Sequence, residues 1–393
     1  MNKIPGRLVA LAISLCLGGC IAVGAVDRRA ATLNEQVAQT QNQGVLLNLA
    51  RAAREEPIYF MAMNQLSASG TTDFRVGAPQ FFLGPRLPAP DQIATFVGGT
   101  TFLDNSTNSN FQMSLLGSKD FYNGLLSPLG LQDVDLLLHQ GYSRELIFYL
   151  VIEKATITTI PAPGATAPPP QVIYNDPADA KTFPLFEYYI KEAMEHGLTT
   201  DTYEAPDETA SDSNDQTASD AKAKSAKRPS LTTHAELCYD RALAIQKDIA
   251  DIAPDSFCGA KPAVRRAGEG AVTGGLPVKL NGQNLQIDVT TRSIYGIFYY
   301  LGGVLRHEQQ SRVQLRHYDL PAEDTKDEPL LQVVEGGHGD ACFTSVSYEG
   351  KSYCVPREGA DNTKRIFGIL NALLALKQTI TDQPVTQTVR IEQ

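Results

Sequence analysis

Apolar and polar residues follow two different periods in the last third of the chain. Asn281-Gly282 separates residues 278–280 from 285–289, and the alternation of apolar and polar residues in the second run predicts a β-hairpin. The next apolar residues recur at helical spacing and predict a helix that begins near Ser293. Its apolar face consists of Ile294, Ile297, Phe298, Leu301 and Leu305.

The remaining C-terminal elements follow the same reasoning. We expect a strand at 330–334, a hairpin at 342–356 that turns at Glu349-Gly350, a helix at 362–379 and a final strand at 385–391. The order of hairpin, helix, strand, hairpin, helix and strand predicts an α+β fold. In such a fold the helices pack on one face of an antiparallel sheet.

The N-terminal half is predicted to begin with a long helix over residues 30–54, because this stretch has few helix breakers and ends before Pro57. Its apolar positions become denser from Val45 onward, so we expect the second half to be buried and the first half to form a stalk. The β-rich segments that follow lie at 58–66, 72–83, 93–102 and 110–116. Helices are then predicted at 118–126, 131–140, 143–152 and 183–195, the last opened by Pro184.

Residues 200–230 contain almost nothing to bury. Acidic residues from Asp201 to Asp220 precede a basic stretch at 222–228, which is typical of a solvated, disordered insertion. The whole chain of 393 residues has 34 Lys and Arg against 44 Asp and Glu, a net charge of −10. Without a basic surplus, nucleic acid is not an expected partner.

The first 19 residues have the layout of a secretory signal peptide. Lys3 and Arg7 precede an apolar run that starts at Leu8. Leu17-Gly18-Gly19-Cys20 looks like the lipobox of bacterial lipoproteins, in which cleavage before the cysteine leaves its thiol to carry a diacylglycerol. Cys20 would then be the lipid anchor of the mature chain, and several acyl chains anchor stably. Because Ile21 follows in place of Asp, the resemblance implies the outer membrane, with the body facing the periplasm.

An uncleaved anchor in the inner membrane is the alternative. The apolar run continues to Val26, so it spans 19 residues, which is long enough to cross a bilayer. Gly18, Gly19 and Gly24 would weaken a spanning helix. The expected organisation is a signal peptide (1–19), an anchor with a stalk helix (20–57), an N-terminal α+β region (58–199), the insertion (200–230) and a C-terminal α+β region (231–393).

Four cysteines remain after the signal and the anchor, an even number in a compartment that permits oxidation. The short separations favour one disulfide between Cys238 and Cys258 and another between Cys342 and Cys354. A zinc site is the alternative, but it usually has C-x₂₋₄-C spacing and neither pair is that close. The residues therefore predict two disulfides, no metal site and no cofactor.

The chain contains no G-x-S-x-G elbow, no H-E-x-x-H motif and no Walker loop. The most suggestive local cluster is the glycine-rich stretch 336–340, which carries His338 and Asp340 beside Cys342. Glycines would let a backbone approach a ligand there, and His338 could act as a base. The alternative is a plain turn that leads into the hairpin, so His338 and Asp340 are weak catalytic candidates.

Four stretches together are similar to a group of uncharacterised proteobacterial envelope lipoproteins. They are 45–51 with 57–60, 120–121 with 125–128 and Gly141-Tyr142, 291–293 with 299–301, and 348–353. The resemblance covers about half of the mature chain and implies a shared fold and location. It implies no catalytic residues, because the group has no assigned activity.

These observations favour a non-catalytic outer-membrane lipoprotein that binds another envelope component, expected to be a protein. The alternative function is an envelope hydrolase that acts on peptidoglycan, polysaccharide or lipid, with His338 and Asp340 as its candidate residues.

Overall fold

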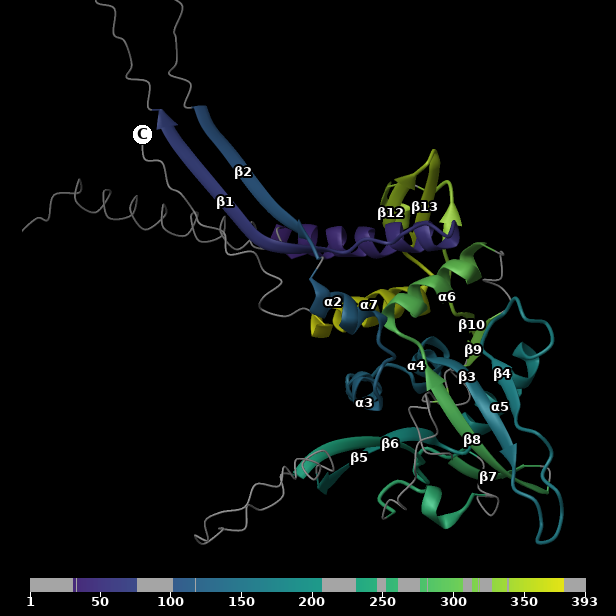
Figure 1. Cartoon of the computed structure of the whole chain (residues 1–393). Helices are drawn as coiled ribbons and strands as arrows, with labels where there is room; N and C mark the ends of the chain where they lie inside the picture. The colour runs from purple at the N-terminus through teal and green to yellow at the C-terminus, as the bar shows by residue number, and fades with distance from the viewer. Residues whose placement is uncertain are drawn as a thin grey trace, which may run out of the picture. The chain divides into compact units, whose positions relative to one another are not determined.

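The computed structural model describes residues 31–32, 34–75, 102–116, 118–206, 231–245, 252–260, 276–280, 282–306, 313–316, 318, 327–337 and 339–377 (Figure 1). Within these ranges, helices and antiparallel strands are combined, which confirms the α+β class. The described strands are divided among five small sheets, where the sequence led us to expect one larger sheet.

The chain forms two compact units. One comprises Met1–Tyr59 and Ser118–Thr379, and the other Phe60–Gly117 and Ile380–Gln393. The described part of the second unit is a hairpin of two long strands, β1 (Met61–Arg75) and β2 (Phe102–Leu115). The sequence predicted four shorter segments here, and the first gap between them, 67–71, lies inside β1. The alternating Ser, Ala, Gly and Thr residues allow an extended backbone to continue through that gap.

The first unit is built around a sheet with the strand order β4-β3-β8-β7. Its strands are β3 (Ile152–Thr159), β4 (Gln171–Tyr174), β7 (Leu276–Leu280) and β8 (Gln283–Thr291). The β7–β8 hairpin confirms the turn predicted at Asn281-Gly282, and Gly282 has a positive φ of 75°. Because β3 pairs with β8 along its whole length, residues on both sides of 200–230 share one sheet. The expected boundary between two α+β regions therefore falls inside a single unit.

The flanks of the expected insertion are also ordered as strands. β5 (Leu198–Pro206) and β6 (Leu231–Tyr239) pair from Leu198 opposite Tyr239 to Pro206 opposite Leu231. Residues 200–206, which the composition assigned to disorder, therefore belong to a strand that pairs with β6. Residues 207–230 lie outside the described part of the chain.

The helices agree closely with the periodicity of the sequence. They are α2 (Lys119–Leu126), α3 (Leu131–His139), α4 (Arg144–Val151), α5 (Phe183–Glu195), α6 (Ile294–Arg306) and α7 (Asp361–Lys377). Ser118 and Ser143 cap α2 and α4 by accepting the backbone N–H three residues later, at 3.0 and 3.3 Å. Local capping and apolar spacing therefore suffice to place these helices.

The strand predicted at 330–334 is wrong. The structure has β9 (Gln314–Arg316) paired with β10 (Asp327–Pro329), and β11 (Val334–Glu335) paired with β13 (Lys351–Pro356). Leu330, Leu331 and Val333 are buried in the connection between β10 and β11. The Gln332 N–H donates to Thr363 Oγ1 of α7 at 2.7 Å, so this backbone bonds to a helix side chain. The predicted strand at 385–391 lies outside the described residues.

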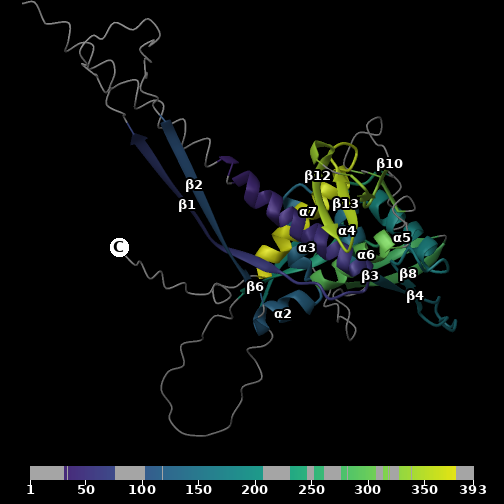
Figure 2. The same ribbon diagram turned by 90° about the horizontal axis from the view of Figure 1, so that it is seen from above.

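The N-terminal helix packs through its second half only. Residues 34–53 are helical, and the buried positions begin at Val45, which confirms the predicted division between an exposed and a buried half. Figure 2 shows this purple helix crossing beside α6. The approach is close, because a Cβ built on Gly302 of α6 would lie 2.6 Å from the carbonyl carbon of Ala52.

Arg292 is a buried arginine that bonds several backbone carbonyl oxygens in the first unit. Nη1 of Arg292 donates to the carbonyl oxygens of Tyr149, Leu150 and Ile152 at 3.2, 3.1 and 2.6 Å, and Nη2 donates to that of Asn175. Its guanidinium carbon lies 3.8 Å from the centre of the Tyr300 ring. Burial lowers the pKa of Arg292 to about 10, and the coulombic effects of Tyr300, Glu153 and Asp176 oppose this, so the side chain stays charged at neutral pH.

Adjacent glycines of α6 give the first prediction. Gly302→Ala should lower the free energy of unfolding by about 1–3 kcal/mol, because its methyl group would collide with the backbone of Ala52. Gly303→Ala should raise it by about 0.5–1 kcal/mol, since nothing lies within 4 Å of the added atom and alanine favours the helix. Urea denaturation of both variants measures the difference. Equal effects would contradict the close packing of the two helices.

The Arg292 network gives the second prediction. Arg292→Lys keeps the charge but cannot reach four carbonyl oxygens, so we expect the free energy of unfolding to fall by about 2–4 kcal/mol. Arg316→Lys is the matched control, because Arg316 is exposed on β9, and it should change stability by less than about 0.5 kcal/mol. The urea midpoint reports both values. A tolerated Arg292→Lys would show that the network contributes little.

Candidate functional site

Both predicted disulfides are confirmed. Cys238 pairs with Cys258, with 5.0 Å between the Cα atoms, and Cys342 pairs with Cys354 at 5.6 Å. The second bond links β12 (Cys342–Tyr348) to β13 within the predicted hairpin, which turns at Glu349-Gly350. Each bond ties a β-strand to a segment close in sequence, so both have a structural role.

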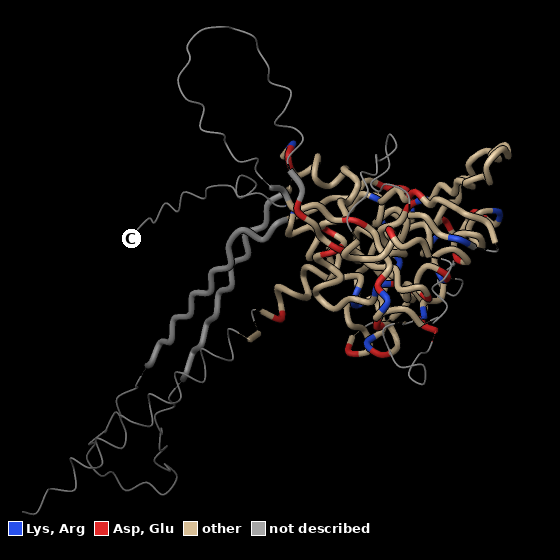
Figure 3. The backbone as a smooth tube through the Cα atoms, turned by 90° about the horizontal axis from the view of Figure 1, so that it is seen from below, with Lys and Arg blue, Asp and Glu red and all other residues tan. Residues whose placement is uncertain are grey.

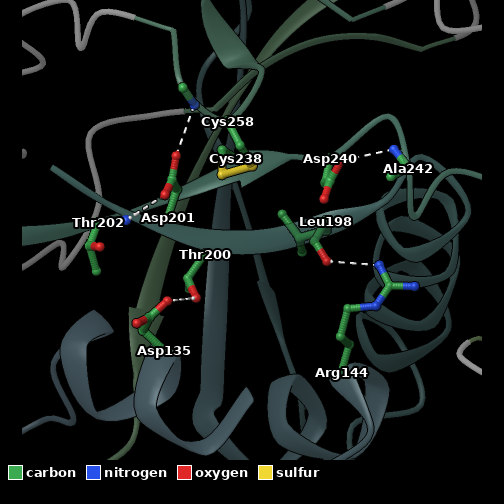
Figure 4. Close-up of a disulfide and its surroundings, with 11 residues drawn as sticks. Asp135, Arg144, Leu198, Thr200, Asp201, Thr202, Cys238, Asp240, Ala242 and Cys258 are labelled. Carbon is green, nitrogen blue, oxygen red and sulfur yellow. Dashed lines mark hydrogen bonds between the residues drawn. A yellow bond between two sulfur atoms is a disulfide. The ribbon is translucent and has the colours of Figure 1, made fainter. Parts of the chain in front are cut away.

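The surroundings of Cys238–Cys258 support that role (Figure 4). Asp201 of β5 accepts the Gly259 N–H at 2.9 Å, and Thr200 donates to Asp135 of α3 at 2.8 Å. Arg144 of α4 donates to the Leu198 carbonyl at 3.1 Å. These contacts join the disulfide strands to two helices.

The glycine-rich stretch beside the second disulfide also has a structural explanation. A Cβ on Gly337 would lie 2.7 Å from Sγ of Cys354, so only glycine fits against the disulfide there. Gly336 and Gly339 have positive φ angles of 90° and 70°. Asp340 is exposed, and its carbonyl oxygen accepts a hydrogen bond from Nε of Arg357 at 3.0 Å. His338 lies outside the described residues, so its pairing with Asp340 stays a prediction.

The expected membrane anchor is also outside the part of the chain that the structure describes, since Cys20 belongs to residues 1–30. Among the described helices, none has the length and apolar character needed to span a membrane. The described residues likewise contain no group of three or more His, Cys, Asp or Glu side chains arranged to hold a metal ion.

A small apolar pocket in the first unit is partly open to the surface. It has a volume of about 40 Å³ and is lined by residues of the main sheet, α5 and the β5–β6 hairpin, such as Ile173, Phe186 and Leu237. A single water needs about 10–15 Å³, so the space corresponds to a few methyl-sized groups. No charged residue lines it. It is therefore a partly open, apolar pocket.

A more organised site lies at the end of the N-terminal helix. Asn48 is buried, and its side chain binds both backbone groups of Tyr59: Nδ2 donates to the carbonyl at 2.7 Å and Oδ1 accepts the N–H at 3.2 Å. Oδ1 also accepts from Nη1 of Arg51 at 3.3 Å. The side-chain amide of Asn48 thus joins the N-terminal helix to Tyr59 in the segment that follows it.

Arg51 lies between two tyrosines that are distant in sequence. Its guanidinium carbon is 5.4 Å from the centre of the Tyr59 ring and 5.7 Å from that of Tyr348, at the end of β12. Both distances are within the range of cation–π attraction. The Tyr348 hydroxyl donates to the Glu56 carboxylate, and this hydrogen bond raises the pKa of Tyr348. We call Arg51, Tyr59 and Tyr348 the Arg–Tyr cluster.

Charged residues of both signs surround the Arg–Tyr cluster. Arg54 pairs with Glu349, and Lys351 pairs with Glu335 at 2.9 Å. Their side chains are largely exposed, so the pairs are screened and contribute little stability. Figure 3 shows that acidic and basic residues also intermingle elsewhere along the described backbone.

This arrangement has the composition of a protein-binding surface. Tyr59 is 49% exposed, so part of its ring is available to a partner. Arginine and tyrosine are enriched among residues that dominate binding energy, and a polar rim around them is typical of interfaces. Because intramolecular contacts already hold these side chains, a partner would lose little free energy in ordering them.

Sequence reasoning missed this site. The sequence singled out the stretches 45–51, 57–60 and 348–353 only because they resemble envelope lipoproteins. It did not predict that they form a surface together. The meeting of Arg51 with Tyr348 depends on how the second hairpin packs against the first helix, which periodicity does not encode. Comparison with known proteins adds no assignment, because no family model, curated protein or solved structure matches the chain.

The Tyr348 hydrogen bond gives the third prediction. The hydrogen bond to Glu56 raises the pKa of Tyr348 above its unfolded value of about 10. The contribution of this hydrogen bond to the stability of the folded state is therefore fully present below pH 10. It is lost as pH rises through the folded-state pKa. Glu56→Gln should shift the titration of Tyr348 to lower pH. Tyrosinate absorbance of the protein minus that of Tyr348→Phe isolates this group, and an unchanged curve in the Glu56→Gln background would contradict the assignment.

Proposed function

We propose that this protein is a periplasm-facing outer-membrane lipoprotein, anchored through Cys20, that binds another envelope protein without catalysing a reaction. The observation that carries the binding role is the Arg–Tyr cluster, in which Arg51 lies beside two tyrosine rings. The cluster combines exposed aromatic surface, charge and internal hydrogen bonds, as binding sites between proteins do.

The rigidity of the cluster supports this function. Tyr59 is attached to the N-terminal helix through both backbone hydrogen bonds to Asn48. Tyr348 is attached through Glu56. A partner that places an apolar group on Tyr59 and an acidic or carbonyl oxygen near Arg51 would therefore meet prepositioned groups.

The proposed location is supported by the lipobox-like residues 17–20 and by the disulfides, which are typical of oxidising compartments. The N-terminal helix would connect the anchor to the body. Residues 34–51 alone extend for about 26 Å at 1.5 Å per residue, and the Arg–Tyr cluster lies at the end of the helix that is farther from Cys20 along the chain.

The hydrolase alternative has weaker support in the described residues. Asp340 is exposed in a short 3₁₀ helix, Gly339–Ala341, and the neighbouring glycines are accounted for by the disulfide and by their backbone angles. We therefore carry the binding function forward.

Recovery of a partner from envelopes tests the proposal and gives the fourth prediction. The lipoprotein is captured in mild detergent, and co-purifying proteins are quantified by mass spectrometry. Tyr59→Ala should reduce recovery of a stoichiometric partner by about 10-fold or more, as expected for a residue at the centre of an interface. Tyr174→Ala is the matched control, because Tyr174 is 44% exposed on β4 and lies outside the Arg–Tyr cluster.

Two results would overturn the proposal. Recovery of the lipoprotein without a partner would contradict the binding role. An equal loss of partner recovery in Tyr59→Ala and Tyr174→Ala would contradict the assignment of the Arg–Tyr cluster as the binding surface. The mass of the intact mature protein tests the anchor separately. Cleavage before Cys20 with added acyl chains is expected, whereas a retained signal segment would establish the uncleaved inner-membrane anchor.

A further inference from the structure

An exposed, proline-rich loop joins β3 to β4. Residues 160–170 read IPAPGATAPPP, and every one of them is exposed. The last pair of the two strands is Ile157 opposite Gln171, so this connection is longer than the about two to five residues that a hairpin loop usually has. Figure 1 shows the loop extending beyond the ends of both strands. We call residues 160–170 the proline arm.

The backbone of the proline arm is restricted by its own sequence. Pro163 and Gly164 are the central residues of a turn in which the Ala165 N–H donates to the Ala162 carbonyl at 3.0 Å. Gly164 has a positive φ of 87°, which fits a type II turn with proline before glycine. Beyond the turn, the three prolines at 168–170 fix their own φ angles and disfavour helical angles in the residues before them. The arm is therefore predisposed to polyproline II geometry.

The proline arm adds no buried surface to the first unit. A hydrogen bond from the Ile160 N–H to the Asn284 carbonyl, at 2.8 Å, attaches its start to β8, but the Ile160 side chain is 43% exposed. Both ends of the arm belong to one sheet, so it does not act as a spacer between separate bodies. The stretch 155–174 carries no charged residue. A contiguous exposed segment without charge is typical of a surface that another molecule covers.

We propose that the proline arm is a second binding surface, which docks in an aromatic-lined groove of a partner protein. Such grooves recognise polyproline II segments, whose backbone has no internal hydrogen bonds and leaves its carbonyl oxygens free to accept them. Because the sequence already restricts the free arm, binding costs little conformational entropy. The lack of charge fits a groove lined by aromatic rings better than an acidic or basic surface. This inference does not depend on the Arg–Tyr cluster.

Photo-crosslinking at the arm tests the inference in the cells that naturally contain the protein. The full chain carries Thr166→p-benzoylphenylalanine, because Thr166 is exposed between the turn and the three prolines. Irradiation then links this residue to the molecule beside it. We expect a protein adduct, and mass spectrometry should place the joined partner residue among Tyr, Trp or Phe residues. Arg316→p-benzoylphenylalanine is the control, because Arg316 is exposed on β9, which belongs to another sheet, and it should not give this adduct.

Proline substitutions in the same chain test the conformational argument. Pro168→Ala, Pro169→Ala and Pro170→Ala together should lower the yield of the Thr166 adduct by about 10-fold or more, because a freer arm loses more entropy on binding. Ala165→Ser keeps every proline and should change the yield by less than about 2-fold. The near-ultraviolet circular dichroism of the triple variant should be unchanged, since the arm contains no aromatic residue.

Four outcomes would contradict the inference. The first two are the absence of a protein adduct at Thr166 and an adduct with a lipid, a glycan or a second copy of this chain. The third is an undiminished yield in the triple proline variant. The fourth is a changed circular dichroism spectrum, which would give the prolines a structural role. Because Tyr59→Ala reports on the Arg–Tyr cluster and the adduct reports on the arm, failure of one proposal is distinguishable from failure of the other.

Discussion

Three carbonyl oxygens at the end of α4 and the start of β3, with a fourth from Asn175, converge on the guanidinium of Arg292. Backbone oxygens at a helix end need hydrogen-bond donors when they are buried, and a single guanidinium supplies several in a fixed geometry. Asn175 shares the task, since its Nδ2 donates to Tyr149 and Ile152 and its Oδ1 accepts from Tyr300. The buried carbonyl oxygens between α4 and β3 therefore find their donors on Arg292, which directly follows β8.

The same network positions the elements that carry the Arg–Tyr cluster. Arg292 lies two residues before the start of α6, and Tyr300 of α6 contacts both Arg292 and Asn175. Two residues later, Gly302 allows the N-terminal helix to approach α6 at backbone distance, and Arg306 donates to the Ala53 carbonyl at 2.8 Å. Tyr299 also donates to the Glu56 carbonyl at 3.1 Å. A buried structural charge is thus connected through one helix to the Arg–Tyr cluster.

Prediction from the sequence succeeded where a signal is local. Pro184 marked the start of α5 and Asn281-Gly282 placed the β7–β8 turn, because both effects act on neighbouring residues. It failed at 330–334, where Gln332 bonds to Thr363 of α7, and at 200–206, where β6 completes a strand of polar residues. In both cases a partner from elsewhere in the chain decided the conformation.

The sequence by itself determined the α+β class, most helices, two hairpins and both cysteine pairs, because periodicity, turn residues and short separations are properties of neighbouring residues. Only the tertiary structure decided that β3 pairs with β8, which joined regions expected to be separate. It also decided that Arg51 meets Tyr348, which is distant in sequence. Apolar spacing specifies which face of a helix or strand is buried, but many distant segments could cover that face. The choice among them is made by close packing and by the satisfaction of buried polar groups, which exist only once the chain has folded.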